Sequence, residues 1–191
     1  FGRPKHTLEI DGKELWEHCR AAFLAAGIEQ IVVVGDVHGG IPGGVRRQDS
    51  VANGLEKVRD AEFVLVHDAA RPLVTNGLIS AVLDRIEAGG VDAVVPALRV
   101  TDTVKRVSGG MVEETVDRAS LVTVQTPQAF TYEALTRVHS EIGDVPVTDD
   151  ASMVEHAGGR VAVVDGDPDN IKVTYPEDLE RARALSERRG G

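Results

Sequence analysis

Hydrophobic residues recur along the first half of the chain with two alternating periods. In Lys13–Ala26 they lie three or four positions apart, which predicts an amphipathic helix that ends at Gly27. Further helices are predicted over Arg47–Val58 and over the stripe from Leu78 to Ile86. Short apolar runs between the helices predict three buried strands, at Ile31–Val34, Phe63–His67 and Ala93–Pro96. This alternation is typical of a parallel sheet with helices on both faces, so we expect an α/β fold.

The pattern changes after residue 100. Thr103–Val107 and Met111–Val116 alternate apolar and polar residues around a Ser108-Gly109-Gly110 turn, which predicts a β-hairpin. Because an isolated hairpin is marginally stable, we expect it to form a protruding arm, residues 100–120, that packs against a second subunit. The rest of the chain predicts strands at Leu121–Gln125 and Val161–Val164, and helices over Thr131–Ile142, after Thr148-Asp149-Asp150 and after Pro176.

Length, charge and cysteine content narrow the class of protein. With 191 residues, we expect residues 1–191 to form one domain. The formal net charge of -10 argues against a general nucleic-acid binder, which carries a basic surface. The single cysteine, Cys19, excludes an intramolecular disulfide and fits a reducing compartment, so we expect a cytoplasmic protein, with a plastid as the alternative. No apolar run approaches the roughly 18 residues of a membrane span.

Several polar residues end or interrupt apolar segments, and each is also compatible with a plain structural role. Asp68 ends the strand Phe63–His67, where a carboxylate can hold a metal ion or a sugar hydroxyl, or simply cap a turn. Lys172 interrupts an apolar stretch, which fits a phosphate ligand or a lysine that reaches solvent from a strand end. Thr148-Asp149-Asp150 fits a helix cap better than a metal site, and His139 and His156 are predicted on helix surfaces.

Six motifs in a fixed order say more than any of these residues alone: His67-Asp68-Ala69-Ala70-Arg71-Pro72, Thr101-Asp102-Thr103-Val104-Lys105, Thr115-Val116-Asp117-Arg118, Gln125-Thr126-Pro127-Gln128, Thr148-Asp149-Asp150-Ala151-Ser152 and Asp169-Asn170-Ile171-Lys172-Val173-Thr174. The set resembles the 2-C-methyl-D-erythritol 4-phosphate cytidylyltransferases, from Pro4-Lys5 to the last helix. The resemblance implies a Rossmann-like fold of the nucleotide-diphospho-sugar transferase type. It also implies transfer of a cytidylyl group from CTP to 2-C-methyl-D-erythritol 4-phosphate, with release of pyrophosphate, in isoprenoid precursor synthesis.

The resemblance assigns roles in the nucleotide site. Lys5 and Lys172 are implied to stabilise the transition state at the phosphates of CTP. Asp68 is implied to bind Mg²⁺ close to the ribose, and Ala69 to contact the ribose through its backbone. The cytosine is implied to contact three further residues: Gly44, Val45 and Ser50.

The resemblance also assigns roles toward the alcohol phosphate. In the body of the protein these fall on Arg71, Thr126, Thr148 and Asp149, and on the arm they fall on Thr103 and Arg118, of which Arg118 is also implied to be catalytic. An arginine suits this role because its planar fork can bind two phosphate oxygens at once. In the family the arm reaches into a partner subunit, so a homodimer with the arm residues acting in trans is implied.

Two departures from the family pattern give further expectations. Family members begin with a strand and a glycine-rich loop that holds the triphosphate, and Phe1-Gly2-Arg3-Pro4-Lys5 aligns just after that loop. We therefore expect the sheet of this chain to lack its central first strand, which would leave a gap in the core. The segment Gly35–Gly44 is also shorter than the usual family connector.

Two other functions stay open. One keeps the reaction but uses ribitol 5-phosphate as the acceptor; the motifs Arg71-Pro72 and Asp117-Arg118 with their neighbours favour the methylerythritol substrate. The other is a non-catalytic nucleotide-binding protein, against which the retention of both Lys5 and Lys172 argues.

Overall fold

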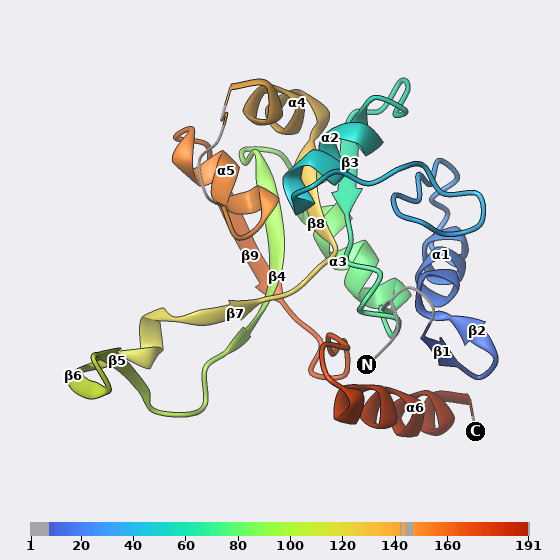
Figure 1. The fold of residues 1–191 in the computed structure, drawn as a ribbon. Helices are drawn as coiled ribbons and strands as arrows, with labels where there is room; N and C mark the ends of the chain where they lie inside the picture. Colours follow the sequence, from blue (N-terminus) through green and yellow to red (C-terminus); the bar gives the residue numbers. More distant parts are fainter. Residues whose placement is uncertain (1–7, 142, 144–146, 191) are drawn as a thin grey trace.

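A five-stranded sheet forms the centre of the computed structural model, which describes residues 8–141, 143 and 147–190 (Figure 1). Strand β8 (Gln128–Thr131) lies between β3 (Phe63–Val66) and β4 (Ala93–Arg99) and is antiparallel to both. Strand β9 (Val161–Asp165) is parallel to β4, whereas β7 (Val122–Val124) is antiparallel to it. Strands β3, β4 and β9 therefore run in one direction, and β7 and β8 run in the other.

The α/β prediction is confirmed, but the sheet is mixed rather than mostly parallel. The reason is the connection between β4 and β7. No crossover helix follows β4 (Ala93–Arg99); the chain enters the arm and returns along β4 as β7 (Val122–Val124). A strand that returns without a crossover must be antiparallel to the strand it left.

The strand predicted at Ile31–Val34 does not form. Val34 alone pairs, in an isolated parallel bridge with Ile41. Ile31–Val34 and β3 (Phe63–Val66) line the same cavity of about 650 Å³, and among the described residues no strand lies between them. A strand needs a neighbour to satisfy its backbone N–H and C=O groups, and this apolar run lacks one.

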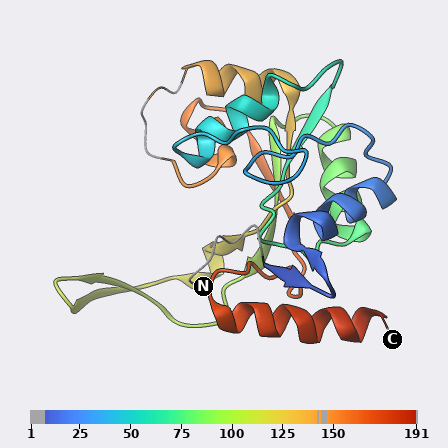
Figure 2. The same ribbon diagram turned by 45° about the vertical axis from the view of Figure 1, so that its right-hand side comes forward.

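Helices cover both faces of the sheet, as predicted. On one face, α2 (Arg47–Leu55), α4 (Tyr132–Glu141) and α5 (Asp150–His156) pack over Val95 and Phe130. On the other face, α3 (Asn76–Glu87) packs over Val94 and Ala129, with α1 (Leu15–Ala25) beyond it (Figure 2). Neighbouring residues of β4 and β8 thus point to opposite cores, the period of two expected of a sheet buried on both faces.

The predicted hairpin is confirmed as an arm. Strands β5 (Val104–Ser108) and β6 (Met111–Val116) pair with each other alone and extend away from the body (Figures 1 and 2). A short 3₁₀ helix, Arg118–Ser120, leads back to β7. Large apolar side chains on the hairpin are exposed: Val107, Met111 and Val112.

A second small core lies at the opposite end of the molecule from α4. The hairpin β1 (Glu9–Ile10) and β2 (Lys13–Glu14) packs against the long C-terminal helix α6 (Pro176–Gly190). Leu8, Ile10, Val173 and Leu185 are buried between them. Within the described ranges, no helix is both long and apolar enough to cross a membrane.

Candidate active site

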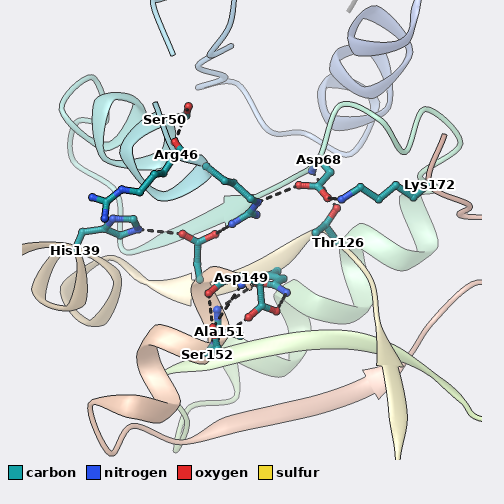
Figure 3. Close-up of polar contacts among 12 residues, drawn as sticks. Arg46, Ser50, Asp68, Thr126, His139, Asp149, Ala151, Ser152 and Lys172 are labelled. Atoms are coloured by element: carbon teal, nitrogen blue, oxygen red, sulfur yellow. Dashed lines mark hydrogen bonds and ion pairs between the residues drawn. The ribbon is translucent and has the colours of Figure 1, made fainter. Parts of the chain in front are cut away.

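Asp68 lies two residues after the end of β3, one residue further than predicted, and its carboxylate is paired with two cations (Figure 3). Lys172 Nζ donates to Oδ2 at 2.6 Å, and Arg47 Nε donates to Oδ1 at 3.3 Å. Burial alone would raise the pKa of Asp68, but the hydrogen bond and charge of Lys172, with those of Arg47, outweigh burial and lower it. The side chain therefore does not cap the following turn, which is closed by the backbone N–H of Arg71 donating to the Asp68 carbonyl.

Behind Asp68, a second carboxylate holds the same arginine. Asp150 is fully buried; one oxygen accepts from Arg47 Nη1 and the other lies 3.0 Å from His139 Nε2. The prediction that His139 lies on a helix surface is wrong, because its side chain is only 7% exposed and faces Asp150. Sequence analysis missed Arg47 entirely: 103 positions separate it from Asp150, and no spacing in the sequence links them.

Thr126 and Arg71 belong to a second polar layer beside Asp68. Thr126 Oγ1 accepts from the backbone N–H of Asp68 at 3.0 Å and lies 3.0 Å from His67 Nδ1. The other ring nitrogen of His67 lies 3.1 Å from the carbonyl oxygen of Arg71. Burial lowers the pKa of His67 to about 4, so the ring is neutral at pH 7. A neutral ring has one N–H; Nε2 donates to the carbonyl, and Nδ1 accepts from the threonine hydroxyl.

Arg71 is anchored at one end only. Its Nη1 donates to the carbonyl oxygen of Asn170 at 2.7 Å, and the Asn170 side chain donates to the Thr126 carbonyl at 2.8 Å. The buried Nε of Arg71 and Oδ1 of Asn170 have no hydrogen-bond partner in the described part of the chain. Burial lowers the pKa of Arg71. The guanidinium retains unused donors beside Asp68, which suits an anion site.

The loop before α2 brings the predicted cytosine residues next to the same cluster. Ser50 Oγ accepts from the backbone N–H of Gly44 at 2.9 Å, and Val45 is 100% exposed. A Cβ at Gly44 would lie 2.2 Å from Cβ of Asp49, so this turn excludes any larger residue. Arg47, the first residue of α2, follows this loop directly and joins it to Asp68. Ala69 is exposed beside Asp68.

The helix cap predicted at Thr148-Asp149-Asp150 is confirmed, but the capping group is the Asp149 carboxylate rather than the Thr148 hydroxyl. Asp149 is the N-cap of α5; one oxygen accepts from the backbone N–H of Ser152 at 2.9 Å and the other accepts from Gln128 Nε2 at 2.7 Å. Thr148 is exposed just before it. Within the described ranges, no group of three or more histidine, cysteine or acidic residues is placed to hold a metal ion.

Two predicted site residues of the described part of the chain, Thr103 and Arg118, are not gathered at Asp68. Thr103 and Arg118 are exposed on the arm, where Arg118 Nη1 donates to the carbonyl oxygen of Thr101. The arm points away from the body that carries Asp68 (Figure 1). Lys5 lies outside the described residues.

Comparison with known proteins agrees with the architecture. The family model "2-C-methyl-D-erythritol 4-phosphate cytidylyltransferase" matches residues 1–188. A bifunctional enzyme IspD/IspF of Rhodospirillum rubrum is 42% identical over 203 residues, which cover 95% of this chain and 52% of that protein. The 2-C-methyl-D-erythritol 4-phosphate cytidylyltransferase of Bacillus anthracis is 50% identical over 141 residues, which cover 73% of this chain and 62% of that protein. The chain thus spans about half the length of the bifunctional relatives.

Solved structures give the same result for the fold. The crystal structure of 2-C-methyl-D-erythritol 4-phosphate cytidylyltransferase from Thermus thermophilus superposes with a TM-score of 0.84 at 35% identity, covering 96% of this chain and 94% of that one. The bifunctional IspDF from Campylobacter jejuni gives 0.80 at 26% identity and covers 95% of this chain but 49% of that one. The chain therefore belongs to the 2-C-methyl-D-erythritol 4-phosphate cytidylyltransferase family.

Proposed function

We propose that this chain transfers a cytidylyl group from CTP to 2-C-methyl-D-erythritol 4-phosphate and releases pyrophosphate. The observation that carries the proposal is the meeting of Lys172 with Asp68 at the end of β3, 104 positions apart in sequence, in a chain of this family. The loop at Gly44 leads into Arg47, which contacts Asp68. Arg71 donates to the carbonyl oxygen of Asn170, close to Lys172 in the sequence.

The reaction requires neutralisation of the phosphate charges and positioning of the two substrates, and it requires no enzyme nucleophile. An oxygen of the alcohol phosphate attacks the α-phosphorus of CTP, a new P–O bond forms, and the bond to the β-phosphate oxygen breaks with its electrons leaving on pyrophosphate. The attacking phosphate is already ionised, so no strong base is needed. Lys172, which is half-exposed, can follow the charge as it shifts to the leaving group. Cys19 is inert, since burial raises the pKa of its thiol to about 12.

We propose Mg²⁺ as the cofactor, held by Asp68. Magnesium bound with nucleotides takes one or two carboxylates, with phosphate oxygens and water completing its shell. One carboxylate at the strand end fits that donor set. When bound, the ion would neutralise phosphate charge; Asp68 would orient it, while Lys172 and Arg47 are the cations that share this carboxylate.

We also propose that the protein is a homodimer in which each arm completes the partner's site. The exposed Val107, Met111 and Val112, and the projection of the arm away from the body (Figure 1), support this arrangement. Arg118→Ala and Lys172→Ala subunits, each inactive alone, should regain partial activity when refolded together. Mixing that restores nothing, with heterodimers verified by differential tags, would place both residues in one subunit's site.

Pyrophosphate release from CTP tests the proposed function. The full chain is incubated with CTP, Mg²⁺ and either 2-C-methyl-D-erythritol 4-phosphate or ribitol 5-phosphate. We expect pyrophosphate release with 2-C-methyl-D-erythritol 4-phosphate and none with ribitol 5-phosphate. Release with ribitol 5-phosphate alone would establish the alternative acceptor, and CTP binding without release from either would establish a non-catalytic protein.

A further inference from the structure

The ion-pair chain Lys172, Asp68, Arg47, Asp150 is half-exposed at one end and fully buried at the other. Their side chains are 47%, 18%, 36% and 0% exposed respectively, so the two ends of the chain differ most. Lys172 is half-exposed to solvent, whereas Asp150 is enclosed and is also held by His139. Arg47, between the two carboxylates, is therefore anchored from the buried side by Asp150.

Lys172 cannot bind phosphate oxygens fully while it is paired with Asp68. Its Nζ lies 2.6 Å from Oδ2, in a close ion pair. Moving Lys172 onto a polyphosphate would leave a largely buried carboxylate without its closest counter-ion, next to a ligand of the same charge. In the absence of Mg²⁺, such a carboxylate is costly unless another cation of the protein takes over its charge.

Arg47 is placed to take that charge. Its Nε lies 3.3 Å from Oδ1 of Asp68, a contact with room to shorten, while Nη1 stays on Asp150. A guanidinium has five N–H donors, and within the described ranges carboxylates use two of those on Arg47. We propose that Arg47 is a positioning residue that holds Asp68 when Lys172 exchanges this carboxylate for the ligand's phosphate oxygens. This inference rests on the proposed function, because it takes the anion that Lys172 meets to be a polyphosphate.

The alternative is that Arg47 merely joins α2 to α5. A structural role and an exchange role differ in one respect. If Arg47 acts through the charge of Asp68, replacing Arg47 should have little effect on anion binding once that charge is removed. If Arg47 only joins the helices, the effect of replacing it on anion binding should be the same whether residue 68 is charged or neutral.

The test is a mutant cycle read by the binding of inorganic tripolyphosphate in the absence of Mg²⁺. Arg47→Met alone would strand Asp150, so the starting variant is R47M/D150N, in which the total charge is unchanged and the buried carboxylate is neutral. D150N alone is the matched control, and circular dichroism with urea unfolding verifies that each variant folds. We expect K172M and R47M/D150N each to weaken binding about tenfold, the size typical of losing one close charge contact, and D150N alone to change it less than about twofold.

Asp68→Asn is then added to both the wild type and R47M/D150N. Removing a negative charge should tighten anion binding somewhat in either background. The inference requires a gain at least about fivefold larger in R47M/D150N, since only there does the unpaired carboxylate hold Lys172 back. Equal gains in the two backgrounds, unchanged binding by K172M, or no tripolyphosphate binding by the wild type would each overturn it. A chain with the expected coupling that releases no pyrophosphate from CTP would refute the proposed function alone.

Discussion

Asp150 in the site and Glu114 on the arm both pair with an arginine, yet their surroundings are opposite. Asp150 is fully buried between Arg47 and His139, whereas Glu114 and its partner Arg106 are 53% and 61% exposed. Water competes for the arm pair and is excluded from the site pair. The same kind of contact should therefore affect stability strongly in the body and weakly on the arm, and the predictions below test that contrast.

The largest effect on stability is expected from Arg47→Met. It removes the cation from a buried carboxylate, a change that typically costs about 3–5 kcal/mol; because His139 still contacts Asp150, we expect the lower end of that range. Urea unfolding measures it. The double variant R47M/D150N should recover most of the loss, since no buried charge is then left without a partner. Equal losses in both variants would mean that packing of the arginine stem, not charge, is responsible.

Lys172→Ala should reduce turnover by about 10²–10³-fold, the usual result of removing one preorganised cation from a transition state. Its half-exposed side chain makes the expected change in stability small. Lys57→Ala is the matched control, because Lys57 is an exposed lysine outside the site. Pyrophosphate release under saturating CTP is the measurement. A variant with normal turnover would contradict the role of Lys172.

His67 should make the body lose stability in mild acid. In the unfolded chain it binds a proton near pH 6.5, but burial lowers its pKa to about 4 in the folded state. Between these values the unfolded state binds more protons. The contribution is thus fully present above pH 6.5 and is lost as the pH falls toward 4, by up to about 3 kcal/mol. Asp68, the acidic neighbour, has a lowered pKa and titrates below this window.

Unfolding free energies measured from pH 7 to pH 4 verify this prediction. His67→Gln should flatten the pH dependence, because the unfolded chain no longer gains a proton at this position. His156→Gln, at an exposed helix position, is the matched control. A wild-type slope that survives His67→Gln would assign the acid sensitivity to another group.

Sequence periodicity predicted most elements within a few residues, because amphipathic stripes and apolar runs report burial directly. It failed at Ile31–Val34, where an apolar run reports burial but not whether a neighbouring strand exists to pair with it. It also failed to give direction to the strands after β4, which depends on how the arm returns.

The site was predictable in part for a similar reason. Asp68 stands out because an acid ends an apolar strand, and the motif set supplied Lys172 as its neighbour. Arg47 and His139 carry no local signal, since an arginine at a helix start and a histidine on a helix are common on surfaces. Their role follows only from the tertiary contact with Asp150.

The smallest effect is expected on the arm. Arg106→Met removes the ion pair with Glu114, in which Nε and Oε1 lie 2.6 Å apart. In spite of this short distance, an exposed pair typically contributes about 0.2–1 kcal/mol, because solvent screens it and both side chains lose rotamer freedom. The free energy of unfolding, measured with urea at low protein concentration, should therefore barely change, in contrast to the loss expected for Arg47→Met. If Arg106→Met cost as much as Arg47→Met, the arm would have to be buried in the species measured. That loss should then fall as the protein is diluted and dimers separate, a dependence that a monomeric contact cannot produce.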